Sequence, residues 1–127
     1  MEDEVNLDRL CAEYGHKIAE EVGNTHVKRP DVLIIDALSV LQEQGLYAFV
    51  LFCRSRSREE KEGAKKIEDL TKDLLKNLNL ISNGDLLDEL RKDNGLLTRL
   101  NELMFAVQVL EKALIYAKFH AKAAKGG

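Results

Sequence analysis

The 127-residue chain is short of residues that interrupt helices, since it holds one proline and eight glycines. Leucine, alanine, glutamate and lysine, which favour helix, are plentiful instead. Long apolar runs are also missing. The longest stretch without a charged side chain covers residues 44–53, well short of the roughly 20 residues that a membrane-spanning helix needs. The composition therefore predicts a helical protein that does not cross a membrane.

Cysteine is scarce as well. Cys11 and Cys53 both lie within apolar helical patterns and form neither a disulfide framework nor the spacing of a zinc site. The acidic residues 1–4 are unlike the positively charged start of a signal peptide. We therefore expect a cytoplasmic protein without disulfides, bound metal or another cofactor.

Charge is unevenly distributed along the chain, whose net charge is -3. Residues 46–67 carry six bases and three acids, and residues 103–127 carry four bases and one acid. Both regions are therefore positive within an acidic chain. Because affinity for nucleic acid follows the number of phosphates neutralised, we expect the isolated chain to bind nucleic acid weakly. It would add a few phosphate contacts to a larger assembly.

Apolar residues at helical spacing predict an all-α, single-domain bundle of about six helices over residues 1–127. Asn6 is the expected N-cap of the first helix, and Ser57 with Glu60 matches the capping box Ser-x-x-Glu before the fourth. A β-strand is the competing interpretation of residues 46–53, which the lack of alternation disfavours. The first expected helix covers residues 6–22, and the second follows Pro30 and ends at Gly45. The others cover residues 46–55, 57–78, 85–92 and 96–124.

Three alternating arginines, Arg54, Arg56 and Arg58, directly follow the apolar run of the third expected helix. Unpaired arginines are not buried, so they mark the point where the chain reaches the surface. The guanidinium group matches both phosphates and carboxylates. Two interpretations stay open, namely contact with the phosphates of a nucleic acid and pairing with the glutamates among residues 59–62.

Lysines form two further basic groups. Lys65 and Lys66 continue the arginine cluster into the next expected helix, and Lys118 and Lys122 lie near the C-terminus. Phe119 lies within the C-terminal group, where an aromatic ring can stack on a base. Packing against a helix face is the alternative for this ring, and it is the one that we expect.

Arg9 and His16 form the motif that points to catalysis. Their spacing resembles the Arg…His signature of HEPN-type ribonucleases, and this alternative stays open, although we expect His16 to be an ordinary surface histidine. Elsewhere no nucleophile is paired with a base, and no glycine-rich phosphate loop is present. We therefore predict that the protein has no catalytic residues and is not an enzyme.

Three stretches together resemble the small subunit of Cmr-type (type III-B) CRISPR effector complexes. Residues 9–22 are similar to the family's opening Arg…Glu-Tyr-Ala…Val pattern, and residues 32–55 to its apolar helix, Asn-Gly-Leu break and Ala-Phe-Leu…Lys segment. Residues 113–123 resemble its closing Leu-x-Trp-Leu-Lys-Arg-Phe-Ala-x-Ala pattern, with Tyr116 in place of tryptophan. Small subunits of type I-A and Csm-type complexes are helical bundles of similar size and remain alternatives.

The resemblance implies a non-catalytic subunit of an RNA-guided ribonucleoprotein in antiviral defence. Such a subunit would help to hold crRNA and target RNA through their phosphates, and would contact other effector subunits and copies of itself. A helical protein–protein adaptor without a nucleic-acid role is a further alternative. The predicted RNA-binding residues are Arg54, Lys118 and Lys122, which the resemblance implies, and Arg56, Arg58, Lys65 and Lys66, which charge alone suggests.

Overall fold

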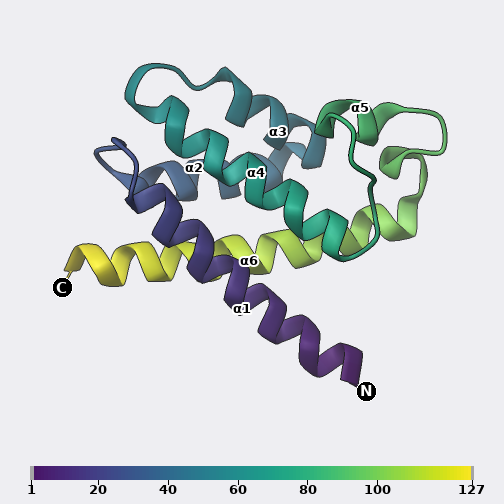
Figure 1. Cartoon of the computed structure of the whole chain (residues 1–127), viewed down its shortest axis with the longest axis horizontal. Coiled ribbons are helices and arrows are strands. Elements are labelled where there is room, and N and C mark those ends of the chain that lie inside the picture. Colours follow the sequence, from purple (N-terminus) through teal and green to yellow (C-terminus); the bar gives the residue numbers. More distant parts are fainter. Residues whose placement is uncertain (1, 127) are drawn as a thin grey trace.

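The computed structural model describes residues 2–126, with side chains for residues 6–125. This part of the chain contains helices and no strand, so the predicted all-α bundle is confirmed (Figure 1). None of these helices has the length and apolarity that crossing a membrane demands. The elements are α1 (Glu2–Gly23), α2 (Pro30–Gln44), α3 (Leu46–Ser55), the 3-10 helix η1 (Arg58–Glu60), α4 (Lys61–Asn77), α5 (Leu86–Arg91), the 3-10 helix η2 (Leu96–Thr98) and α6 (Leu100–Gly126).

The long helices α1 and α6 cross at Gly15 (Figure 1). A Cβ atom at this position would lie 2.5 Å from Tyr116 Cβ and 2.9 Å from the Ala113 carbonyl oxygen, so a glycine lets the two backbones meet. Nearby, Cys11 Sγ donates a hydrogen bond to the Val109 carbonyl oxygen at 3.6 Å. This close approach fixes the distance between the first and the last helix of the chain.

Helices α2, α3 and α4 alternate in direction (Figure 1). Helix α2 packs against α6, α4 packs against α1, and α3 packs against both α2 and α4. Gly45 has a φ of 95°, which suits glycine and allows the sharp reversal between α2 and α3. Burial of each large apolar side chain contributes about 1.5–3 kcal/mol to folding. The largest fully buried side chains are Ile18, Leu33, Ile34, Leu41, Phe49, Ile67, Leu74, Leu75, Leu86, Leu90, Leu96 and Leu110.

The connection from α4 to α6 is held by polar bonds as well as by leucines. The buried Glu89 carboxylate accepts a hydrogen bond from the Ser82 backbone N–H at 2.8 Å. The Arg99 guanidinium donates to the Leu80 carbonyl oxygen at 2.6 Å. These bonds satisfy backbone groups that belong to no helix, so they hold the short α5 and its flanking loops in place.

Two predicted helix starts are wrong. The first helix begins at Glu2, so Asn6 lies inside it rather than capping it. The last expected helix is divided, because residues 96–98 form η2 and α6 begins at Leu100. Residues 46–53, for which a strand was the competing interpretation, are helical in α3.

The predicted capping box before the fourth helix is also wrong. Ser57 has extended backbone angles, but its side chain makes no capping hydrogen bond. Arg58 then adopts a φ of 55°, and the chain makes the single turn η1 before α4 begins at Lys61. The left-handed residue redirects the chain, so Glu60 cannot complete the reciprocal pair with Ser57.

Candidate nucleic-acid interface

The fold brings three basic segments to one end of the molecule. Because α2, α3 and α4 alternate in direction, the loops before α2 and before α4 lie at the same end, and the last turns of α6 reach it too (Figure 1). Lys28 Nζ lies 3.7 Å from Glu59 Oε2 across the two loops, and Lys125 Nζ lies 3.5 Å from Asp31 Oδ2 at the start of α2. We call residues 24–29, 56–66 and 118–125 the basic end.

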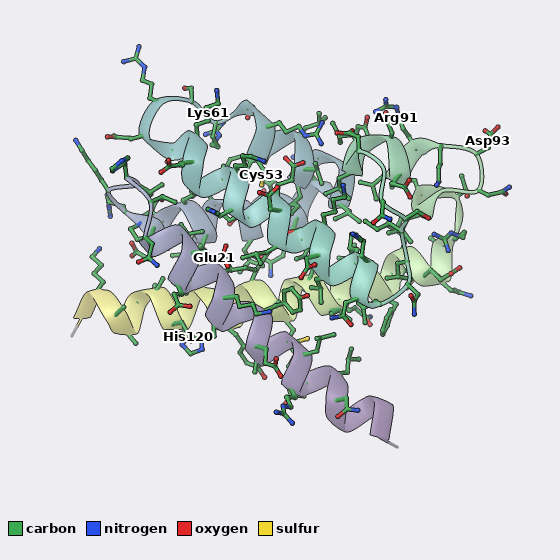
Figure 2. The ribbon with its side chains drawn as sticks, viewed as in Figure 1. Glu21, Cys53, Lys61, Arg91, Asp93 and His120 are labelled. Atoms are coloured by element: carbon green, nitrogen blue, oxygen red, sulfur yellow. The ribbon has the colours of Figure 1, made fainter. Side chains whose placement is uncertain are left out.

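The basic end concentrates positive charge on a protein whose net charge is -3. It holds ten of the 19 lysines and arginines but three of the 22 acidic residues, and it stays positive when the adjoining Glu20, Glu21 and Asp31 are included. Figure 2 shows Lys61 at this end and Asp93 at the opposite one. Two positive regions that are far apart in the sequence therefore act on one part of the surface.

Arg54, one of the contacts that the resemblance implies, is held by two carboxylates. Its guanidinium donates hydrogen bonds to Glu68 Oε2 and to Asp85 Oδ1, both at 2.8 Å, and so joins α3, α4 and the N-cap of α5. These bonds raise the pKa of Arg54, and the hydrogen bond from Arg54 lowers the pKa of Asp85. A phosphate would have to displace one of these partners, so the geometry favours a structural role for Arg54.

Arg56 packs back onto the helix that it follows. Its guanidinium carbon lies 4.3 Å from the centroid of the Phe52 ring, and Nη2 donates a hydrogen bond to Ser55 Oγ at 3.1 Å. Nη1 lies 3.7 Å from Glu60 Oε1, which is the pairing with the glutamates of residues 59–62 that the sequence left open. The side chain is 33% exposed, so Arg56 presents little of itself to a phosphate.

Arg58 is exposed, and no side chain among residues 6–125 pairs with its guanidinium. Its φ of 55° lies in the left-handed region, which costs a residue with a side chain roughly 1–2 kcal/mol. The other non-glycine residues with positive φ in residues 2–126 are Asn79 and Asn94, and asparagine tolerates this conformation best. An arginine in a costly conformation without an internal partner is available to an external anion.

Three of the five lysines of α4, namely Lys61, Lys65 and Lys66, lie in its first two turns. Lys65 Nζ lies 3.3 Å from Asp69 Oδ2, an exposed pair one turn apart that stabilises the helix little. Lys61 and Lys66 have no such partner among the side chains that the structure describes. An open depression that Lys61 borders is lined also by His26, Arg58, Glu59, Glu62 and Lys65.

The C-terminal lysines share one face of α6. Lys118 and Lys122 are one turn apart, and Lys125 follows on the same face, as helical geometry requires. Lys122 is exposed, whereas Lys118 is half-buried and its Nζ lies 4.8 Å from the centroid of the Phe119 ring. The pairing of Lys125 with the first turn of α2 places this face beside the loop of residues 24–29.

Phe119 is the exposed aromatic ring of the basic end. The prediction that it packs against a helix face is wrong, since it is 58% exposed. The small side chains of Ala117 and Ala121 form the buried face of α6 in this turn instead. Tyr116 is half-buried, and its hydroxyl donates a hydrogen bond to Asp8 Oδ1 at 2.8 Å. Phe119 is therefore the ring placed to stack on a base.

Sequence reasoning missed two bases of this surface, Lys28 and Arg29. Both are exposed in the loop before α2, far along the chain from the other basic segments. A signal for them was present in the sequence, because short connections between helices indicate an up-and-down arrangement. In such an arrangement every second loop lies at the same end of the bundle. A count of charges along the chain does not show that these loops are close in space.

The residues considered for catalysis do not come together. Arg9 Nε lies 3.2 Å from Glu13 Oε1, and the ring of His16, two turns further along α1, contacts the ring of His120. Cys53 is a buried free thiol whose pKa burial raises to about 12, so it is a core residue as expected. Within the part of the chain that the structure describes, no three His, Cys, Asp or Glu side chains gather as metal ligands.

Comparison of the chain with protein-family models, with curated proteins and with solved structures found no match in any of the three. Support for a function therefore comes from the residues and geometry of the chain itself, together with the resemblance of its sequence to Cmr-type small subunits.

Proposed function

We propose that this chain is a non-catalytic, RNA-binding small subunit of a CRISPR effector ribonucleoprotein related to the Cmr (type III-B) complexes, and that its basic end contacts the RNA backbone. One observation carries the proposal, namely that three segments distant in the sequence supply ten bases to one end of an acidic bundle. Such a concentration of positive charge indicates an anionic partner. The sequence resemblance indicates RNA as that partner.

The phosphate contacts are assigned to bases that have no partner among the described side chains. These are Arg29, Arg58, Lys61, Lys66 and Lys122, whereas Arg54 and Arg56 serve the fold. Arginine and lysine hold phosphate oxygens without reading bases, so the contacts are independent of RNA sequence. That property suits a subunit that supports a guide and its target, where base pairing supplies the specificity.

The isolated chain should bind RNA weakly and in a strongly salt-dependent manner. About five contacts to a single strand give a slope of roughly -3.5 for log K against log salt concentration. Repulsion from the acidic remainder of the protein lowers the affinity further, since the net charge is -3. Useful affinity would therefore arise inside an assembly, where neighbouring subunits add further contacts.

Contacts with other effector subunits and with copies of the chain are assigned to apolar surface away from the basic end. Leu100 is 66% exposed and Met104 is 53% exposed, one turn apart at the start of α6, and the exposed Leu97 lies just before them in η2. Clustered apolar side chains in water indicate a protein-binding surface. The proposal therefore gives the two ends of the bundle different partners within a cytoplasmic complex.

Fluorescence anisotropy with a labelled single-stranded RNA tests the proposal. At about 50 mM salt the native chain should bind, and the double variant Arg58→Ala, Lys66→Ala should bind at least about tenfold more weakly. The matched control Lys17→Ala, Lys76→Ala removes the same charge from exposed positions outside the basic end and should change affinity less than about twofold.

Two results would contradict the proposal. Absence of binding by the native chain at this salt concentration would favour the protein–protein adaptor, and an equal loss in both double variants would show that only net charge matters. Cleavage of the RNA that disappears in His16→Ala would favour the ribonuclease alternative.

A further inference from the structure

Two of the three histidines of the chain meet at the crossing of α1 and α6. The ring centroids of His16 and His120 lie 5.3 Å apart, and the ring planes are inclined by 78°. Both residues are exposed, and Figure 2 shows His120 on the outer side of α6, near its crossing with α1. The pair joins the first helix to the last. His120 lies within the basic end, but neither histidine is among the bases assigned to phosphate contact.

The helix crossing holds this pair in place. His16 directly follows Gly15, whose missing side chain lets the backbone of α1 approach Tyr116 and Ala113. His120 stands one turn after Tyr116 on α6. The two Cα positions are therefore fixed by close backbone packing, and the imidazole rings remain free to turn about their own side-chain bonds. A site built on rigid helices binds without reorganising the fold.

The spacing of the rings suits a shared metal ion. An imidazole nitrogen binds zinc at about 2.0–2.1 Å, and it lies roughly 1 Å from its ring centroid, so two imidazoles at a tetrahedral angle have centroids roughly 5 Å apart. The observed 5.3 Å agrees with this value. In the present edge-to-face arrangement each ring has to turn to point one nitrogen at the ion, and exposed side chains do this at little cost.

The imidazole nitrogens of the pair are not used by the fold. No side chain or backbone group of residues 6–125 forms a hydrogen bond with either ring. No third His, Cys, Asp or Glu in the described part of the chain completes a set of ligands, so water or a partner's side chain would fill the remaining positions. Imidazole ligands suit zinc, copper and nickel rather than magnesium or calcium.

We propose that His16 and His120 together bind one divalent transition-metal ion, with zinc as the physiological candidate, and that the ion ties α1 to α6. Both ligands come from the folded crossing and neither is next to the other in the unfolded chain. Binding should therefore stabilise the native state by mass action. The proposal does not depend on RNA binding, and the failure of one leaves the other standing.

Thermal unfolding of the full chain without a histidine tag tests the site, with Zn²⁺ and Ni²⁺ as probes and Mg²⁺ as the negative control. The native chain should show a saturable rise in Tm with either transition metal. The rise should disappear in His16→Ala and in His120→Ala, and isothermal titration should show affinity lower by about tenfold or more. His26→Ala, which changes the third, exposed histidine, should behave like the native chain.

Circular dichroism without metal should show that all three variants keep the native helix content, because the replaced side chains are exposed. His16→Gln and His120→Gln repeat the test with a side chain of similar size that binds metal poorly. A native chain that shows no shift with either transition metal overturns the proposal. A shift that survives in either single variant, or that is lost equally in His26→Ala, overturns it as well.

Discussion

Arginines at the two ends of the bundle have different surroundings. At the end that carries α5 and η2, Arg91 donates a hydrogen bond to the Tyr47 hydroxyl at 2.6 Å, and Arg99 pairs with Glu102 at 2.8 Å. At the basic end, Arg58 has no such partner among residues 6–125. The end that carries α5 and η2 uses these two arginines for structure, whereas the basic end holds Arg56 against Phe52 and leaves Arg58 available to a ligand.

The three alternating arginines show the same division within five residues of sequence. Arg54 ties three helices through Glu68 and Asp85, Arg56 covers Phe52, and Arg58 stands free in a left-handed conformation. A cluster of like charges is therefore not one functional unit. The partners that the fold supplies to each guanidinium, rather than its place in the cluster, distinguish a structural arginine from a binding one.

The largest effect on stability is expected at the end that carries α5 and η2, which we call the structural end. Glu89→Ala removes the acceptor of the Ser82 N–H and the partner of Lys92 from a buried position, so it should lower the free energy of unfolding by about 2–3 kcal/mol. Glu89→Gln keeps an acceptor and should cost less. Urea denaturation measures both, and RNA affinity should not change. A loss below about 0.5 kcal/mol would contradict the structural role of this end.

A smaller loss of stability is expected at Arg54, which joins α3, α4 and the N-cap of α5. Arg54→Ala should lower the free energy of unfolding by about 1.5 kcal/mol, because it breaks a two-carboxylate network, and Arg54→Lys should restore part of this loss. RNA affinity should change less than about twofold. Unchanged stability together with weaker RNA binding would instead support the phosphate contact that the resemblance implies for Arg54.

Acid should weaken the structural end. Hydrogen bonds from Arg54 and from the Ser82 N–H lower the pKa of Asp85 and of Glu89, respectively. Carboxylates with a lowered folded-state pKa stabilise the fold fully above their ordinary values of 3.8 and 4.5, and this contribution is lost as the pH falls through the folded values.

The free energy of unfolding, measured by urea at successive pH values, should therefore fall below about pH 4.5. The fall should be smaller in Arg54→Ala, which has already lost the bond that lowers the pKa of Asp85. A stability that is constant down to about pH 3, or an equal fall in the variant, would contradict this account.

The smallest effect on stability, and the sharpest contrast with function, is expected at Arg58. Glycine adopts a φ of 55° without strain, so Arg58→Gly should raise the free energy of unfolding by about 0.5 kcal/mol while weakening RNA binding. Arg58→Ala keeps the strain and should lose the same RNA affinity without a gain in stability. Destabilisation by more than about 1 kcal/mol in Arg58→Gly would place this residue among the structural arginines.

Most of the fold was predictable because its helices are strongly patterned. Leu70, Leu74 and Leu75 recur at helical spacing and are buried, and Gly45 ends α2 as expected. The capping box failed for a local reason that the pattern Ser-x-x-Glu does not contain, since the left-handed Arg58 turns the chain away from the cap. The backbone of one residue decided the start of α4.

The site was less predictable, because whether each base is paired or free depends on contacts between distant segments of the chain. Asp85, which binds Arg54, lies beyond α4 in the sequence, so local charge arguments considered residues 59–62 instead. The same holds for Lys28, which reaches Glu59 through the alternation of helices. Sequence indicated where positive charge is concentrated, and the tertiary structure distinguishes the bases that are paired from those that are free.

The salt dependence of RNA binding tests the central claim most directly, because the slope of log K against log salt concentration counts phosphate contacts. If Arg58 and Lys66 each hold a phosphate of a single strand, the double variant Arg58→Ala, Lys66→Ala should lower the magnitude of the slope by about 1.4. The control Lys17→Ala, Lys76→Ala should leave the slope of the native chain unchanged. A slope that is the same in all three proteins would contradict an RNA contact at the basic end.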